Sequence, residues 1–246
     1  MSLTAHRAVW VAVSCSAVAC AGDAVPEAPP LTLAEASEQV TFASTEMLGP
    51  HRFLATSTRV ESRYDSELSR HEETIEVRWQ DWDNFRYERS VDGRSVEAVV
   101  VSGGRGWTQR GRSWSSVADA ELYRTQLRMT WNAWDQGTRS FGERLALSAS
   151  EADTVEGRPA RRYTVSLAEA TVADAPGPRT QGKMDPRSLS GVLWVDEATA
   201  VRLMAQLDGV LSRDGYTQEL RLQLARTEVG VTQEIEPPVA GKEQEQ

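Results

Sequence analysis

The residue types that carry catalytic or metal chemistry are sparse in this chain and poorly grouped. The three histidines, His6, His51 and His71, lie far apart in the sequence, whereas a zinc site needs three or four ligands in a compact set. No Gly-x-Ser-x-Gly, His-Glu-x-x-His or phosphate-binding loop occurs. The sequence therefore predicts no metal site, no cofactor and no catalytic nucleophile.

Paired carboxylates are the remaining candidates for chemistry. Glycosidases use two such groups across the scissile bond, and Asp81 and Asp83 flank Trp82, a ring suited to stacking on a sugar. The high turn propensity of Asp-Trp-Asp-Asn explains the same residues equally well. We interpret these pairs, together with Glu72–Glu73 and Asp196–Glu197, as turn residues or solvated strand residues. An enzyme acting on envelope glycans is the weakest function considered.

The two cysteines, Cys15 and Cys20, both lie near the N-terminus. A short basic start precedes an apolar run from Ala8 to Val18, and small residues follow, which is the pattern of a secretory signal. The stretch Ala17-Val18-Ala19-Cys20 resembles the lipobox of bacterial lipoproteins. That resemblance implies that Cys20 is diacylated, becomes the first mature residue and anchors the chain to a membrane.

Other interpretations of this N-terminus remain open. Cys15 is a rival site of lipidation, but the apolar stretch before it is short. A transmembrane helix needs roughly 20 apolar residues, more than this run offers, and a secreted protein without lipid would need only the signal. Ala21 would be the second mature residue, and by analogy with enterobacterial lipoproteins it favours the outer membrane, facing the periplasm.

Composition then sets the domain organisation. The chain has 246 residues and a formal net charge of −9, which argues against nucleic acid as a partner. We expect a signal peptide over 1–19, a flexible Pro-rich tether over 20–30, one domain over 31–234 and a disordered tail over 235–246.

Hydrophobic periodicity predicts a mainly β (α+β) domain. Helices are expected over 32–48 and 120–136, the second ending at Gly137, and a long Pro/Gly-rich loop is expected over 171–188. Period-two segments separated by turn residues predict strands over 53–61, 73–80, 84–91, 95–102, 105–110, 144–150, 160–167, 191–196, 201–208 and 216–227. These strands should form a large, curved antiparallel sheet with the two helices on its concave face.

Three segments carry a resemblance to a known fold. They are FRYERSVDGRSVEAVVVSGGRGWTQRG at 85–111, VEGRPARRYTVSL at 155–167 and LSGVLWVDEATAVRLMAQLDG at 189–209. With the order of elements they resemble the LolA/LolB-like lipoproteins, including the LppX/LprG type. The resemblance implies a half-barrel closed by helices around an apolar cavity.

The second predicted helix supplies the candidate binding residues. Tyr123, Leu127, Trp131 and Trp134 share one face of it, and apolar pockets are lined by such side chains. We therefore expect a non-enzymatic envelope lipoprotein that holds a lipid or a lipoprotein acyl chain. The alternative is an envelope sensor or scaffold of the same fold with a filled core.

Overall fold

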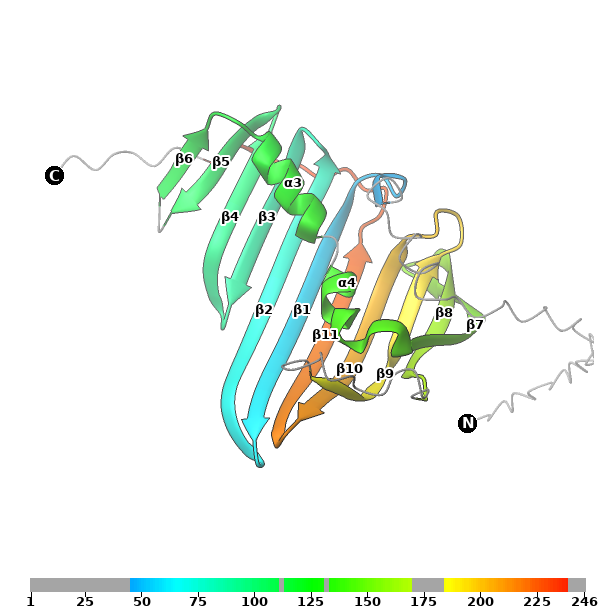
Figure 1. Cartoon of the computed structure of the whole chain (residues 1–246). Coiled ribbons are helices and arrows are strands. Elements are labelled where there is room, and N and C mark those ends of the chain that lie inside the picture. Colours follow the sequence, from blue (N-terminus) through cyan, green and yellow to red (C-terminus); the bar gives the residue numbers. More distant parts are fainter. Residues whose placement is uncertain (1–44, 111–112, 131–132, 170–183, 239–246) are drawn as a thin grey trace, which may run out of the picture.

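The chain forms one open antiparallel sheet of eleven strands in the computed structural model (Figure 1). Residues 45–110, 113–130, 133–169 and 184–238 are described here. The strands are β1 (His51–Arg63), β2 (Ser66–Asp81), β3 (Asn84–Val91), β4 (Arg94–Ser102), β5 (Arg105–Arg110), β6 (Ser113–Val117), β7 (Leu145–Val155), β8 (Arg158–Leu167), β9 (Asp185–Asp196), β10 (Arg202–Arg213) and β11 (Tyr216–Thr227).

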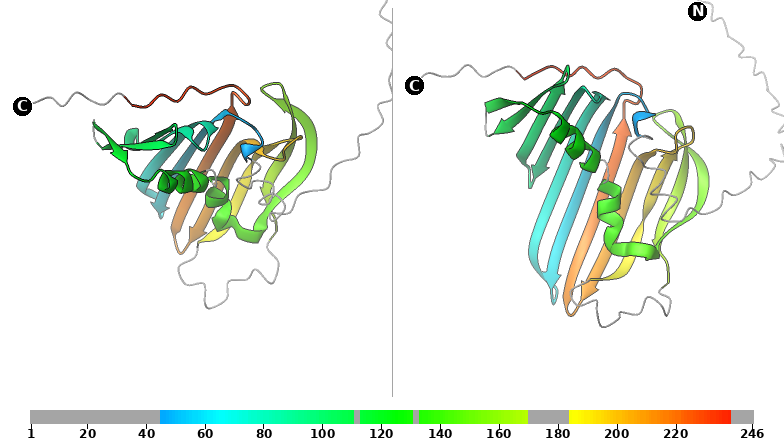
Figure 2. Two further views of the ribbon diagram at one scale, coloured as in Figure 1. Left: turned by 90° about the horizontal axis from the view of Figure 1, so that it is seen from above. Right: turned by 45° about the horizontal axis from the view of Figure 1, so that its top comes forward.

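Two meanders meet in the middle of this sheet. The strand order is β6-β5-β4-β3-β2-β1-β11-β10-β9-β8-β7, so the first and last strands of the chain pair with each other at the centre. The two outermost strands, β6 and β7, do not pair, and the sheet stays open. It curves around the helices (Figure 2), which confirms the predicted half-barrel with helices on its concave face.

Tight turns fix the register of most hairpins. Asp92 and Gly93 have φ values of 49° and 72°, and Asp214 and Gly215 have 51° and 79°. Two successive residues with positive φ form the hairpin turn whose twist matches that of the strands. Gly103 and Gly104, with φ values of 57° and 75°, form a turn of the same kind between β4 and β5.

The helical connection from β6 to β7 carries the chain across the concave face, from one edge of the sheet to the other (Figures 1 and 2). It contains α3 (Glu121–Thr130), α4 (Ala133–Thr138) and the 3-10 helix η1 (Arg139–Arg144). The helix predicted over 120–136 corresponds to α3 and α4, the described parts on either side of 131–132, and α4 extends to Thr138. No helix in the described residues has the length and apolar character needed to cross a membrane.

The bounds of several other predicted elements differ from those in the structure. Strand β6 was not predicted, and β9 begins at Asp185, inside the loop expected over 171–188. Of the helix expected over 32–48, Thr45 and Glu46 are helical, whereas 32–44 lie outside the described residues. The predicted signal peptide and tether also lie outside them.

The main core fills the concave side beneath the helices. Cross-strand partners such as Phe53 and Val77 point to the same side, as do Ala55 and Leu224. The cluster is rich in large side chains, including Trp79, Phe85, Tyr87, Leu193, Leu207 and Leu222. A smaller cluster of Leu48, Val155, Ala160, Val201 and Leu203 lies apart from it.

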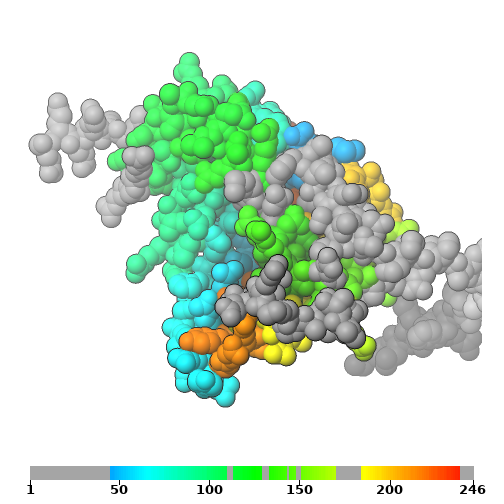
Figure 3. All heavy atoms as spheres, viewed as in Figure 1, coloured from blue at the N-terminus to red at the C-terminus, as the bar shows by residue number. Residues whose placement is uncertain are grey.

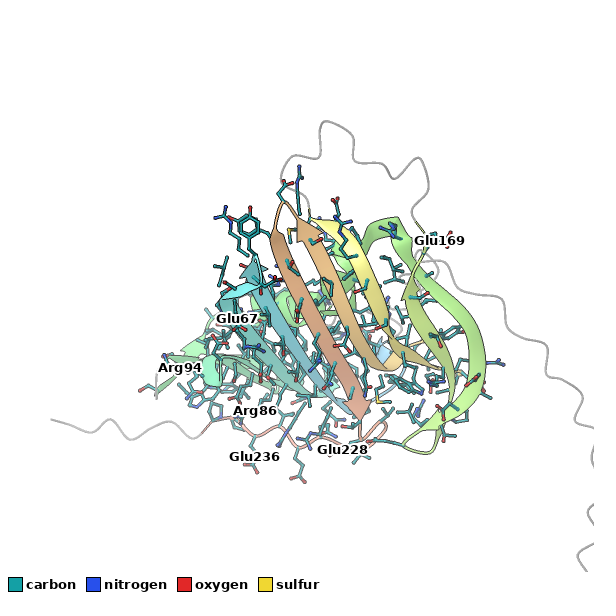
Figure 4. The ribbon with its side chains drawn as sticks, turned by 90° about the horizontal axis from the view of Figure 1, so that it is seen from below. Glu67, Arg86, Arg94, Glu169, Glu228 and Glu236 are labelled. Atoms are coloured by element: carbon teal, nitrogen blue, oxygen red, sulfur yellow. The ribbon has the colours of Figure 1, made fainter. Side chains whose placement is uncertain are left out.

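The C-terminal segment after β11 returns along the opposite face of the sheet (Figures 2 and 4). The backbone N–H of Gln233 donates to Oε1 of Gln80 at 2.8 Å, and Ser102 Oγ donates to the carbonyl of Ile235 at 3.0 Å. The segment is therefore held against the ends of β2 and β4 as far as Ile235, the first residue of the expected tail.

Candidate functional site

Three of the four side chains predicted to line a cavity lie between the helices and the sheet. Leu127 is 0% exposed and Trp134 is 1% exposed, and both belong to the main core. Tyr123 is partly buried and packs against the same cluster. Trp131 lies outside the described residues. Three of the four predicted residues therefore lie in the main core or pack against it. Their role in lining a ligand cavity stays a prediction.

Helix α4 and the 3-10 helix approach the sheet very closely. A Cβ added at Gly137 would lie 2.8 Å from Cδ2 of Leu222, and one added at Gly209 would lie 2.3 Å from Cζ of Phe141. Gly137 lies inside α4, so the prediction that it ends the helix is wrong. Its lack of a side chain instead lets the helix backbone approach β11.

A group of basic side chains is buried on the concave side of the sheet and was not predicted. His51, Arg202 and Arg226 are 0%, 2% and 2% exposed. Nη1 of Arg226 on β11 donates to the backbone carbonyl oxygen of Arg202 on β10, so the two residues lie next to each other. The guanidinium carbon of Arg202 lies 5.0 Å from the Trp134 ring centre, and that of Arg226 lies 4.9 Å from the Phe53 ring centre.

Burial dominates the electrostatics of this group. It lowers the pKa of Arg202 to about 10, while Asp135, whose Oδ1 is 3.3 Å from Nη2, acts in the opposite direction. Burial and then the charge of Arg202 lower the pKa of Arg226 to about 9. Both arginines therefore keep their charge at neutral pH, in a region from which water is largely excluded.

His51 is held neutral in the same place. Burial, followed by the charge of Arg226, lowers the pKa of His51 to about 4, although a hydrogen bond between Nδ1 and the carbonyl of Gly49 opposes this. The imidazole packs against Trp79, with ring centres 5.3 Å apart. A neutral ring suits this site, because a charged ring would lie beside the positive charge of Arg226.

This burial predicts a specific loss of stability in acid. A histidine with a pKa of 6.5 when unfolded and about 4 when folded stabilises the fold fully above pH 6.5. That contribution is lost as the pH falls from 6.5 to 4, a change of about 3 kcal/mol. We expect His51→Asn to flatten the decline in unfolding free energy over this range in urea titrations. A decline as steep in His51→Asn as in the parent protein would contradict the expectation.

The concave face beyond the helices is polar. In Figure 3 the lower ends of β1 and β2 (cyan) and of β10 and β11 (orange) project past the green helices. A pocket of about 220 Å³ lies there, lined by Ser57, Arg59, Glu61, His71, Glu73, Arg89, Val91 and Leu220. Arg89 forms an ion pair with Glu73 inside it. The polarity of this part of the concave face does not suit an apolar ligand.

A larger pocket of about 350 Å³ lies on the opposite face of the sheet, between β2, β1, β11, β10 and β9. Its walls include the charged side chains of Arg70, Asp208, Glu219 and Arg221. Arg221 Nε donates to Oδ1 of Asp208 at 2.8 Å, so two of these charges neutralise each other. Neither pocket gathers apolar groups of the kind that hold acyl chains.

The carboxylate pairs have structural roles. Oδ1 of Asp81 accepts hydrogen bonds from the backbone of Asp83 and from Asn84, which closes the β2–β3 turn. Asp196 is 2% exposed and accepts from Thr199 and Arg158 in the β9–β10 turn. Within the described ranges, no group of three or more His, Cys, Asp or Glu side chains is arranged to hold a metal ion.

Comparisons with known proteins find similarity only among solved structures. No family model matches the chain, and no curated protein matches its sequence. The lipoprotein LppX of Mycobacterium tuberculosis is 8% identical, with a TM-score of 0.29 over 82% of this chain and 96% of LppX. A LolA superfamily protein of Nitrosomonas europaea is 8% identical, with a TM-score of 0.22 over 79% of this chain and 93% of that protein.

A third similar structure is the Pseudomonas aeruginosa MucA/MucB complex. Its matched chain is 20% identical, with a TM-score of 0.27, and the match covers 78% of this chain but 57% of that one. LppX and a LolA superfamily protein, the two kinds named by the sequence resemblance, are thus among the structures that this chain resembles.

Proposed function

We propose that this chain is a non-enzymatic cell-envelope lipoprotein that binds an apolar ligand, a lipid or a lipoprotein acyl chain, between its curved sheet and its helices. The anchor would be lipid on Cys20, and the site would face the periplasm from the outer membrane. The supporting observation is the apolar concave face crossed by α3 and α4, which connect two unpaired edges of the sheet.

The way the helices are attached makes such binding feasible. They are held to the sheet by side-chain packing and by a few side-chain bonds, such as those from Arg124 to the carbonyl of Trp82 and from Arg202 to Asp135. Neighbouring strands are instead joined by ladders of backbone hydrogen bonds. Movement of α3 and α4 away from the sheet would therefore open the apolar side without breaking a strand pair. Aromatic and aliphatic surface exposed in this way is what acyl chains bind.

A scaffold or sensor with a filled core is the second candidate. It is favoured by the burial of Leu127, Trp134 and Phe141, each 1% exposed or less, and by the close contact of Gly137 with Leu222. In that case the helices would be permanent parts of the core. Partners would then bind the outer surfaces of the molecule.

Binding of a fluorescent fatty-acid analogue separates these candidates. The test uses the full chain with Cys20→Ser, so that the protein's own acyl chains do not compete. We expect saturable binding that unlabelled fatty acid reverses, and lipid in the mass spectrum of organic extracts of the purified protein. Tyr123→Ala should weaken binding severalfold, because this partly buried ring packs at the border of the core.

The neighbouring residue provides the matched control. Leu122 is 67% exposed on the same helix, so Leu122→Ala should leave probe affinity unchanged. Absence of saturable binding to the unsubstituted fold would contradict the carrier function and favour the scaffold. Equal weakening by both variants would show that Tyr123 does not line the site.

A further inference from the structure

Arg226 carries a positive charge that the described part of the chain does not neutralise. It is 2% exposed, and none of the acids in the described ranges forms an ion pair with it. The charge of Arg202 acts on it and repels it. Asp135 is the acid that pairs with Arg202, and its side chain is 37% exposed. The buried set is therefore short of one negative charge.

Such an arrangement is costly unless an anion completes it. A buried charge without a partner is strongly unfavourable, and arginine is suited to binding carboxylate and phosphate through two parallel hydrogen bonds. Nη1 of Arg226 is occupied by the carbonyl of Arg202, but its Nε is buried without an acceptor among the described residues. The guanidinium group thus has hydrogen-bonding capacity left for a ligand.

A second donor nearby has the same property. Nε1 of Trp134 is buried and has no acceptor in the described part of the structure. The Trp134 ring lies 5.0 Å from the guanidinium carbon of Arg202, the same residue whose carbonyl binds Arg226. Two donors without acceptors therefore border one arginine, and what both lack is an oxygen acceptor.

The surroundings indicate what else the ligand carries. Arg226 lies over the Phe53 ring, and Phe53 and Trp134 belong to the main apolar core. Asp135, in the first turn of α4, is the part of the cluster that reaches solvent. A small inorganic anion would use the charge but not this apolar lining, whereas an acyl chain with an anionic head uses both.

We propose that Arg226, together with Arg202 and Nε1 of Trp134, binds the carboxylate or phosphate head of an amphiphilic ligand whose acyl chain lies against the concave apolar face. This inference rests on the proposed function, because the head can reach the arginines only when the chain enters beneath α4. It adds a requirement to that function: the preferred ligand is an anion.

Three fluorescent probes that share one hydrocarbon chain and differ in their head groups test whether the site requires an anion. They carry a carboxylic acid, its methyl ester and a monoalkyl phosphate, and they are titrated into the full chain with Cys20→Ser. We expect the acid or the phosphate to bind at least tenfold more tightly than the ester, since a charge-assisted hydrogen bond is lost in the ester. Whichever anion binds more tightly identifies the source of the head.

Substitution of the arginine completes the test. Arg226→Met should reduce the affinity of the anionic probes to that of the ester and leave the ester unaffected. Arg221→Met is the matched control on the same strand, because Arg221 lies on the opposite face and pairs with Asp208. If Arg226→Met does not fold, two other measurements decide whether Arg226 binds the anion. They are the ratio of acid to ester affinity in the parent protein and the same ratio in Arg226→Lys, which should be smaller.

The outcomes separate this inference from the proposed function. Equal affinity of the parent protein for acid, ester and phosphate would overturn the anion site while the carrier function stands. Failure of all three probes to bind would overturn the carrier function, and the anion site with it.

Discussion

Trp134→Ala should lower the free energy of unfolding by about 3–5 kcal/mol. The indole is 1% exposed, and it fills the space between α4 and the sheet while the Arg202 guanidinium lies over its ring. Removing it would leave a cavity and would also expose a buried cation to a void. Urea denaturation followed by circular dichroism measures the loss.

Trp114 provides the matched control. It is a partly exposed tryptophan on the edge strand β6 and is not in the main core, so Trp114→Ala should cost clearly less. A loss of less than about 1 kcal/mol in Trp134→Ala would contradict tight packing. It would mean that Trp134 borders space on one side, as expected for a side chain that lines an open cavity.

The strand order was largely accessible from the sequence. Asp92-Gly93 and Gly103-Gly104 adopt the positive φ values that hairpin turns require, and they separate segments of period two. The local signals therefore coincide with the tertiary arrangement along each meander. The pairing of β1 with β11 has no such local signal, because the two strands are joined by no turn and lie at opposite ends of the domain.

The connection across the concave face was harder to predict. Tyr123 and Leu127 lie in α3 and Trp134 lies in α4, as the helical stripe predicts, but the 3-10 helix that follows at Arg139–Arg144 was not expected. Gly137 was interpreted as a helix stop, but it is a point of close approach to Leu222. A glycine selected for packing and one selected for its conformation look the same in a sequence.

The buried basic cluster had no signal in the sequence. Arg202 and Arg226 stand among strands in which arginine is the common solvent-facing residue, so nothing distinguishes them from exposed ones such as Arg221. Register decides the difference, because Arg226 lies opposite Phe53 and shares its face. Only the pairing of distant strands shows which arginines point under the helices.

Cys20→Ser should release the protein from the membrane fraction almost completely. The small residues before Cys20 and the apolar run behind them predict a lipid-modified first residue of the mature chain. Two or more acyl chains give stable anchoring, because each buried CH₂ contributes about 0.8 kcal/mol. Fractionation after a high-salt wash, combined with metabolic labelling by an alkyne fatty acid, measures both attachment and its cause.

Cys15→Ser is the matched control for this prediction. Cys15 lies inside the apolar run, so its substitution should preserve both the label and the membrane association. Loss of the label in Cys15→Ser, with retention in Cys20→Ser, would place the lipid on the other cysteine. Membrane association of Cys20→Ser without any label would mean that the chain is held by protein contacts or by an uncleaved apolar segment, and the lipoprotein assignment would then be wrong.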